Sequence, residues 1–163
     1  MNQRTRDGLV RVLIYAFPAL IDILVVQIGF VNAIRLAKMG ASASTVAGIA
    51  ALWSFVYMIT CLLVSRLATP ANAVRMMIWA CVSMVVLCWL FTVVQGVIWI
   101  YVLCAGVGAA TAFFFPPFQI FMKAVDTVGS RPITYSAGLY TFSWSMGFAV
   151  GPFVAGFLME KEI

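Results

Sequence analysis

Long apolar runs are the feature that most constrains this chain. A helix needs about 20 apolar residues to cross a bilayer, and in hydrocarbon only helices and closed barrels satisfy every backbone N–H and C=O group. Barrel strands are about 10 alternating residues long, which is too short for the runs here. The runs therefore predict five membrane-spanning helices, at residues 12–34, 44–66, 74–94, 97–122 and 134–159.

The composition agrees with a membrane protein. Hydrophobic residues make up 64% of the chain and charged residues 9%, whereas soluble domains are about 45–50% apolar and about 25% charged. The breaks between the runs are short, so we expect an all-α integral membrane protein with a single helical bundle over residues 12–159. A basic cytoplasmic tail, residues 1–11, precedes the bundle, and a short tail, residues 160–163, follows it.

The chain lacks the residues that most enzymes and metal sites use. It contains no histidine, and its four cysteines fall inside apolar runs without metal-ligand or redox spacing. We therefore expect no metal, no cofactor and no enzymatic activity. The cysteines are interpreted as small packing residues.

The basic residues predict the orientation. Placing the N-terminus in the cytoplasm puts seven Lys and Arg residues inside and three outside, in accord with the positive-inside rule. We expect a multi-pass protein of the plasma (inner) membrane, with lipid rather than nucleic acid as the partner of its net charge of +5. The inside set is Arg4, Arg6, Arg11, Arg66, Arg75, Lys123 and Arg131, and the outside set is Arg35, Lys38 and Lys161.

Asp22 is an acidic residue near the middle of the first apolar run. A carboxylate there costs about 2.5–3.5 kcal/mol on insertion scales, so it is expected to avoid lipid. It either faces a cavity and binds a substrate or a coupling proton, or it is a protonated acid bonded to another helix. Pro18, four residues earlier, leaves the carbonyl of Ile14 without its donor and predicts a kink beside the acid. Gln27 and Asn32 are further candidates for a transport path or for interhelical bonds.

The fourth and fifth runs contain further polar and kinked positions. In the fourth, Pro116 and Pro117 are expected to kink or end the helix, and Gln119 is a polar candidate. In the fifth, Tyr140 and Trp144 share one helical face and either line a pocket or pack in the core.

The stretch GFAVGPFVAG lies in the fifth run. In a bilayer its glycines can form a helix contact surface and its proline a permitted bend. The spacing resembles the fifth span of major facilitator superfamily transporters, G-x8-G-x3-G-P-x2-G-G, with Ala155 in place of one glycine. GVGAA in the fourth run resembles the family's G-x-G-A-A. The matching residues are Gly138, Gly147, Gly151, Pro152 and Gly156, together with Gly106 and Gly108.

Other positions in the loops and spans depart from the family pattern or keep only part of it. Val102 stands where the family often has arginine, and the loop after the second span keeps Arg66 of the family's charged motif, with Arg75 following. Asp126 and Arg131 lie where the family commonly keeps charged gate contacts; they form either such a gate or a solvated pair.

The resemblance implies the N-terminal half of a secondary transporter that moves a small solute by alternating access. Such a protein has twelve spans, so we expect this chain to be a fragment, truncated after the fifth span, whose missing spans come in cis or from a second chain. Asp22, Gln119, Tyr140 and Trp144 would then face the central path. The alternative is a non-transporting membrane scaffold or partner subunit that associates through small-residue helix faces.

Overall fold

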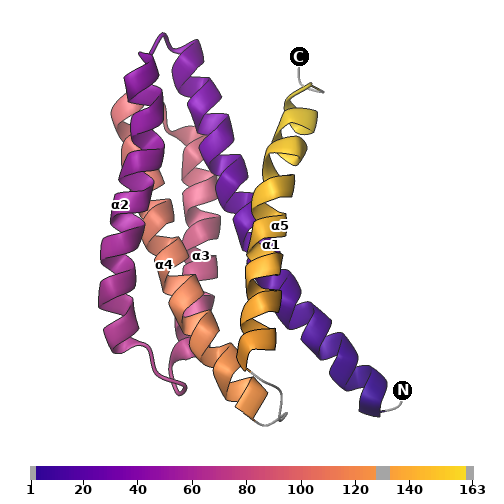
Figure 1. Cartoon of the computed structure of the whole chain (residues 1–163). Helices are drawn as coiled ribbons and strands as arrows, with labels where there is room; N and C mark the ends of the chain where they lie inside the picture. Colours follow the sequence, from indigo (N-terminus) through magenta and orange to yellow (C-terminus); the bar gives the residue numbers. More distant parts are fainter. Residues whose placement is uncertain (1–2, 128–132, 161–163) are drawn as a thin grey trace. The chain divides into compact units, whose positions relative to one another are not determined.

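A computed structural model describes residues 3–127 and 133–160, with side chains at Val12, from Ile14 to Ala124 and from Thr134 to Glu160. The described residues form five helices joined by short connections (Figure 1). Each helix contains a stretch long and apolar enough to cross a membrane. The fold is thus that of an all-helical, multi-pass membrane protein. The helices are α1 (Gln3–Lys38), α2 (Ala43–Leu67), α3 (Ala73–Val93), α4 (Val97–Thr127) and α5 (Ile133–Glu160).

Two helices extend beyond the apolar runs that predicted them. α1 begins at Gln3 rather than at residue 12 and ends at Lys38 rather than at residue 34. α4 continues past Pro116 and Pro117 to Thr127, so the proline pair does not end it. Hydropathy marks where the chain crosses the bilayer, whereas a helix continues until its backbone finds a cap or a turn.

Glycine allows two of the turns. Gly40 has a φ of 78° directly after α1, and the N–H of Ala41 then donates to the carbonyl of Leu36 at 3.0 Å. Gly96, with a φ of 106°, turns the chain between α3 and α4. A side chain at either position would be strained, because L-residues avoid positive φ.

Polar side chains fix the other described connection and the start of α2. Ser42 caps α2 by accepting a hydrogen bond from the N–H of Thr45 at 3.2 Å. Asn72 holds the turn between α2 and α3, because its amide donates to the carbonyl of Leu67 at 2.9 Å and accepts from the N–H of Thr69 at 2.7 Å.

The described residues group into two compact units. The first contains α1 as far as Gln27 together with α5, and the second contains α1 from Ile28 together with α2, α3 and α4. α1 therefore contributes its first part to one unit and its last turns to the other.

In the second unit, α4 packs against both α2 and α3. In an 18-residue apolar window of α4, 50% of the residues are buried, against 6% in the corresponding window of α2. Gly108 permits the contact with α2, since a Cβ there would lie 2.7 Å from the carbonyl oxygen of Trp53. Gly106 faces α3, where a Cβ would lie 2.9 Å from Cδ2 of Leu87. The two glycines thus face different neighbours of the same helix.

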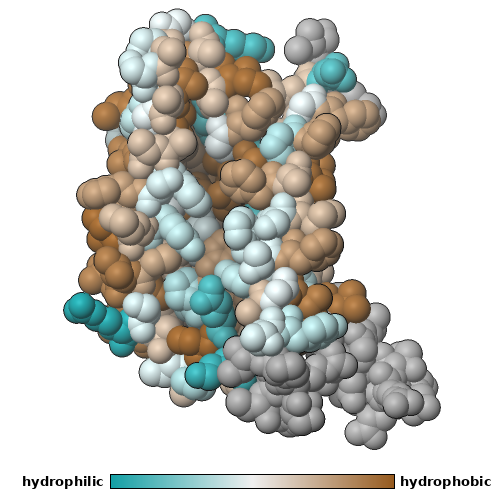
Figure 2. All heavy atoms as spheres, viewed as in Figure 1, coloured by the Kyte–Doolittle hydropathy of each residue, from teal (hydrophilic) through white to brown (hydrophobic). Residues whose placement is uncertain are grey.

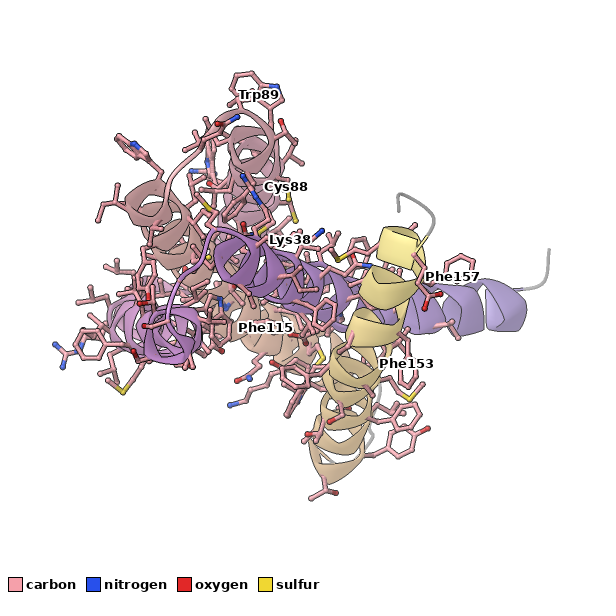
Figure 3. All side chains as sticks on the ribbon, turned by 90° about the horizontal axis from the view of Figure 1, so that it is seen from above. Lys38, Cys88, Trp89, Phe115, Phe153 and Phe157 are labelled. Carbon is pink, nitrogen blue, oxygen red and sulfur yellow. The ribbon has the colours of Figure 1, made fainter. Side chains whose placement is uncertain are left out.

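The outward surfaces of the helices are apolar. Brown, hydrophobic side chains run along the helices on the face seen in Figure 2. Trp89 projects outward from α3, and Phe153 and Phe157 project from one side of α5 (Figure 3). Phe153 is 82% exposed. Exposed apolar surface of this extent suits contact with lipid rather than with water.

Candidate functional site

A close contact in the first unit joins the middle of α1 to α5. A Cβ added to Gly147 would lie 2.9 Å from both the Cα of Ala19 and the Cβ of Asp22, and closer still to the carbonyl oxygen of Ala19. One turn further along α5, a Cβ on Gly151 would lie 3.0 Å from the Cβ of Val26. The absence of side chains at the two glycines is what lets the helix backbones approach so closely.

Ser143 adds a polar connection one turn before Gly147. Its Oγ accepts a hydrogen bond from the backbone N–H of Ala19 at 3.2 Å and donates to the backbone carbonyl of Tyr15. Tyr15 and Ala19 are four residues apart, so they are an i, i+4 donor–acceptor pair of α1. A hydroxyl from α5 therefore bonds to both ends of one step in the hydrogen-bond ladder of α1.

Pro18 explains why the backbone of α1 bonds to the Ser143 hydroxyl of α5 beside this proline. It is fully buried and has no N–H, so the carbonyl of Ile14 lacks its intrahelical donor. Ladders interrupted in this way are often supported by Ser or Thr side chains of neighbouring helices. Ser143 supports the adjacent step. On the opposite helix, half-buried Pro152 follows Gly151 directly, so both helices carry a proline beside the contact.

Asp22 lies inside this contact. Its side chain is 8% exposed, and its Oδ2 atom is buried without a hydrogen-bond partner. Its Cβ faces Gly147, so α5 covers the acid on that side. A buried carboxyl oxygen without a partner is costly, and in membrane proteins ionisable groups of this kind are typical of substrate or ion pathways.

Gly138 and Gly156, the other glycines of the spacing on α5, lie away from any contact. Space is open around both, with nothing within 4 Å of an added Cβ. Gly147 and Gly151 are buried and belong to the α1 contact, whereas Gly106 and Gly108 belong to the second unit.

The remaining path candidates divide between the two units. In the first, Gln27 and Tyr140 are half-buried and Trp144 is 37% exposed. In the second, Gln119 is exposed near the end of α4, and Asn32 is buried and donates to the carbonyl of Ile28 at 2.8 Å. The side-chain amide of Asn32 therefore bonds to the backbone of its own helix, α1.

Arg35 has a structural role in the second unit. Its guanidinium donates to the carbonyl of Phe91 at 2.8 Å and to that of Val94 at 3.1 Å, and it also reaches Oδ1 of Asn32 at 3.4 Å. The last carbonyls of a helix have no intrahelical donor, and a cation there also complements the helix dipole. Arg35 of α1 therefore caps the C-terminus of α3.

The predicted cytoplasmic loop residues are only partly described. Arg66 and Arg75 are exposed, at the end of α2 and the start of α3. The side chain of Asp126, and Arg131 altogether, lie outside the described residues. No group of three or more His, Cys, Asp or Glu side chains in the described part of the chain could hold a metal ion.

Ser143 and Arg35 were not singled out as site residues from the sequence. For Ser143 a signal exists, because Ser143, Gly147, Gly151 and Ala155 recur every four residues and all four are buried. For Arg35 the sequence indicates only a charge near the end of a span. The α3 carbonyls that it caps become its neighbours only through the packing of the helices.

No protein-family model matches this chain, and no curated protein or solved structure does.

Proposed function

We propose that the chain forms part of a secondary transporter of the major facilitator type, which moves a small solute across the membrane by alternating access. The observation that supports this most is the position of Asp22. A buried carboxyl group with an unpartnered oxygen lies where α1, one turn after Pro18, meets Gly147 of α5, one turn before Gly151 and Pro152.

The cost of burying the carboxyl group of Asp22 favours a functional role for it. A carboxyl group at membrane depth is expensive, and one that only stabilised the fold would be expected to use both oxygens in hydrogen bonds. In our proposal Asp22 keeps Oδ2 available for a solute or a proton. Because an acid attracts cations and can hydrogen-bond neutral groups, the solute is neutral or cationic rather than anionic.

The contact between α1 and α5 would also serve the conformational change. Small residues let the two backbones move past each other without side chains that interlock, and Pro18 and Pro152 give each helix a point at which to bend. Alternating access needs a second bundle that rocks against this one, so the proposed machine includes further spans from the same polypeptide or from a partner.

Transport by the complete protein in proteoliposomes tests the proposal. A panel of neutral and cationic solutes is screened first for thermal stabilisation of the purified protein, and uptake of the stabilising solutes is then measured. We expect Asp22→Asn to abolish uptake or to remove its pH dependence, while Asp22→Glu retains part of it. Glu160→Gln, which removes an exposed carboxylate at the end of α5, is the matched control and should transport normally.

Normal uptake by Asp22→Asn with unchanged pH dependence would remove Asp22 from the proposed role. If no solute on the panel is taken up, and the protein instead copurifies with other membrane proteins in a manner that depends on Gly147, a scaffold is the better account.

A further inference from the structure

A groove runs between α3 and α4 on the second unit. Its volume is about 500 Å³. The polar groups among its lining side chains are the hydroxyl of Ser83 and the indole N–H of Trp79, and the rest are apolar. The lining residues are Trp79, Ser83 and Leu87 of α3, and Gly106, Ala110 and Phe113 of α4, with their neighbours on the same faces.

The groove lies within the membrane-spanning parts of both helices. From Trp79 to Leu87 it extends along α3 for about 12 Å at 1.5 Å per residue. Trp79 and Leu87 are equally far from Ser83, the middle residue of α3, so the groove lies across the middle of the span, within a hydrocarbon core about 30 Å thick. Its apolar lining suits the deeper part of an acyl chain that enters from the Trp79 end.

A cation lies one helical turn beyond the Trp79 end of this groove. Arg75 is four residues before Trp79, so it lies on the same face of α3 one turn toward the loop. Its side chain is exposed, and it makes no hydrogen bond or ion pair with the described part of the chain. Arg75 lies in the first turn of α3, where the helix dipole adds positive potential.

Two further cations lie at the same end of the unit. Arg66 is in the last turn of α2, and Lys123 is near the end of α4, both exposed. Among the described side chains of the second unit, from Ile28 to Ala124, no Asp or Glu opposes these charges. The described charged side chains at this end of the unit are therefore all basic.

We propose that the α3–α4 groove binds an anionic phospholipid, with an acyl chain against Trp79, Ser83 and Phe113 and the headgroup phosphate at Arg75. Charge complementarity selects the anionic headgroup, since a basic side chain near the membrane surface attracts acidic lipid. A helix from another protein would bury the apolar lining equally well, but it would not need the cation at the groove's end.

Native mass spectrometry of the full chain in detergent tests this inference. The protein is titrated with dioleoyl phosphatidylglycerol or dioleoyl phosphatidylcholine, and the lipids retained per chain are counted. We expect one phosphatidylglycerol to be held more tightly than phosphatidylcholine. Arg75→Gln should weaken its binding about fivefold, which corresponds to the contribution of one basic residue near a membrane surface.

Matched variants separate lipid binding in this groove from a general attraction between anionic lipid and basic residues. Arg66→Gln removes an equal charge from the same end of the unit, but from α2, and should weaken binding less than Arg75→Gln. Ala109→Phe fills the groove and should abolish retention of the tight lipid, whereas Ala50→Phe on the exposed face of α2 should not. Circular dichroism checks that the Ala109→Phe protein keeps its helices. If that protein is unfolded, the loss of phosphatidylglycerol binding in Arg75→Gln tests the proposal independently.

Three results would overturn the proposal: equal retention of the two lipids, equal effects of the two arginine substitutions, or unchanged binding in a folded Ala109→Phe protein. Dimers that form in place of lipid binding, and that Ala109→Phe disrupts, would overturn it in favour of a second copy of the chain. None of these outcomes bears on transport through Asp22, because the groove and the acid belong to different units.

Discussion

Gly147 of α5 lies against the backbone of Ala19 in α1, with 2.9 Å between the Cα of Ala19 and the place where a Cβ of residue 147 would stand. Backbone atoms cannot rotate away as a long side chain can. The contact therefore requires glycine at 147 and sets how closely the two helices approach beside Asp22.

The first prediction concerns this glycine. Gly147→Ala should lower the free energy of unfolding by about 1–3 kcal/mol, because the added methyl group overpacks a contact made by backbone. Gly156→Ala is the matched control, since space is open around Gly156. It should be neutral or stabilising by up to about 1 kcal/mol, because alanine favours a helix over glycine. Reversible unfolding in mixed detergent measures both, and equal effects would contradict a close contact at 147.

The second prediction concerns the hydroxyl of Ser143. Ser143→Ala should destabilise the protein by about 0.6–1.7 kcal/mol, between the average and the maximum measured for interhelical hydrogen bonds in membranes. Ser145→Ala makes the same chemical change at an exposed position two residues away and should change stability little. The same unfolding assay compares the two. If Ser145→Ala costs as much as Ser143→Ala, the bonds to Tyr15 and Ala19 do not stabilise the contact.

The outlines of this fold follow from hydropathy, because crossing a bilayer demands an apolar helix of defined length. That requirement predicts the helices and most of their bounds. It does not predict that α1 begins at Gln3 or that α4 continues past Pro117, since polar residues can extend a helix beyond the membrane.

The candidate site is predictable only in part, for a related reason. Asp22 and Gly147 stand out in the sequence, one by its charge and the other by its spacing. Gly138 and Gly156 belong to the same spacing, yet space is open around both. A motif counts positions along one helix, whereas a contact depends on which helix lies opposite at that level. Ser143 becomes meaningful only once Tyr15 and Ala19 are known to face it.

The third prediction concerns the cap that Arg35 forms on α3. Arg35→Gln should cost about 1.5–3 kcal/mol, because the bonds to the carbonyls of Phe91 and Val94 are charge-assisted. It should also speed amide hydrogen exchange in the last turn of α3 and in the connection to α4. Lys38→Gln removes an exposed charge from the same end of α1 and should leave that exchange unchanged. Uniform acceleration in both variants would indicate a general charge effect instead of a cap.

Disulfide cross-linking in native membranes tests the central claim, the contact of α1 and α5 at the level of Asp22, most directly. Cys61, Cys81, Cys88 and Cys104 are first replaced by alanine. A Cβ on Gly151 would lie 3.0 Å from that of Val26, close to the roughly 3.5–4.5 Å that a disulfide spans. Replacing Val26 by cysteine removes its Cγ1 atom from this contact, and a shift of about half an ångström brings the two Cβ atoms to disulfide distance. Val26→Cys with Gly151→Cys should therefore cross-link on mild oxidation, while Val26→Cys with Phe153→Cys, on the exposed side of α5, should not. Failure of the first pair, or equal cross-linking of both, would contradict the account.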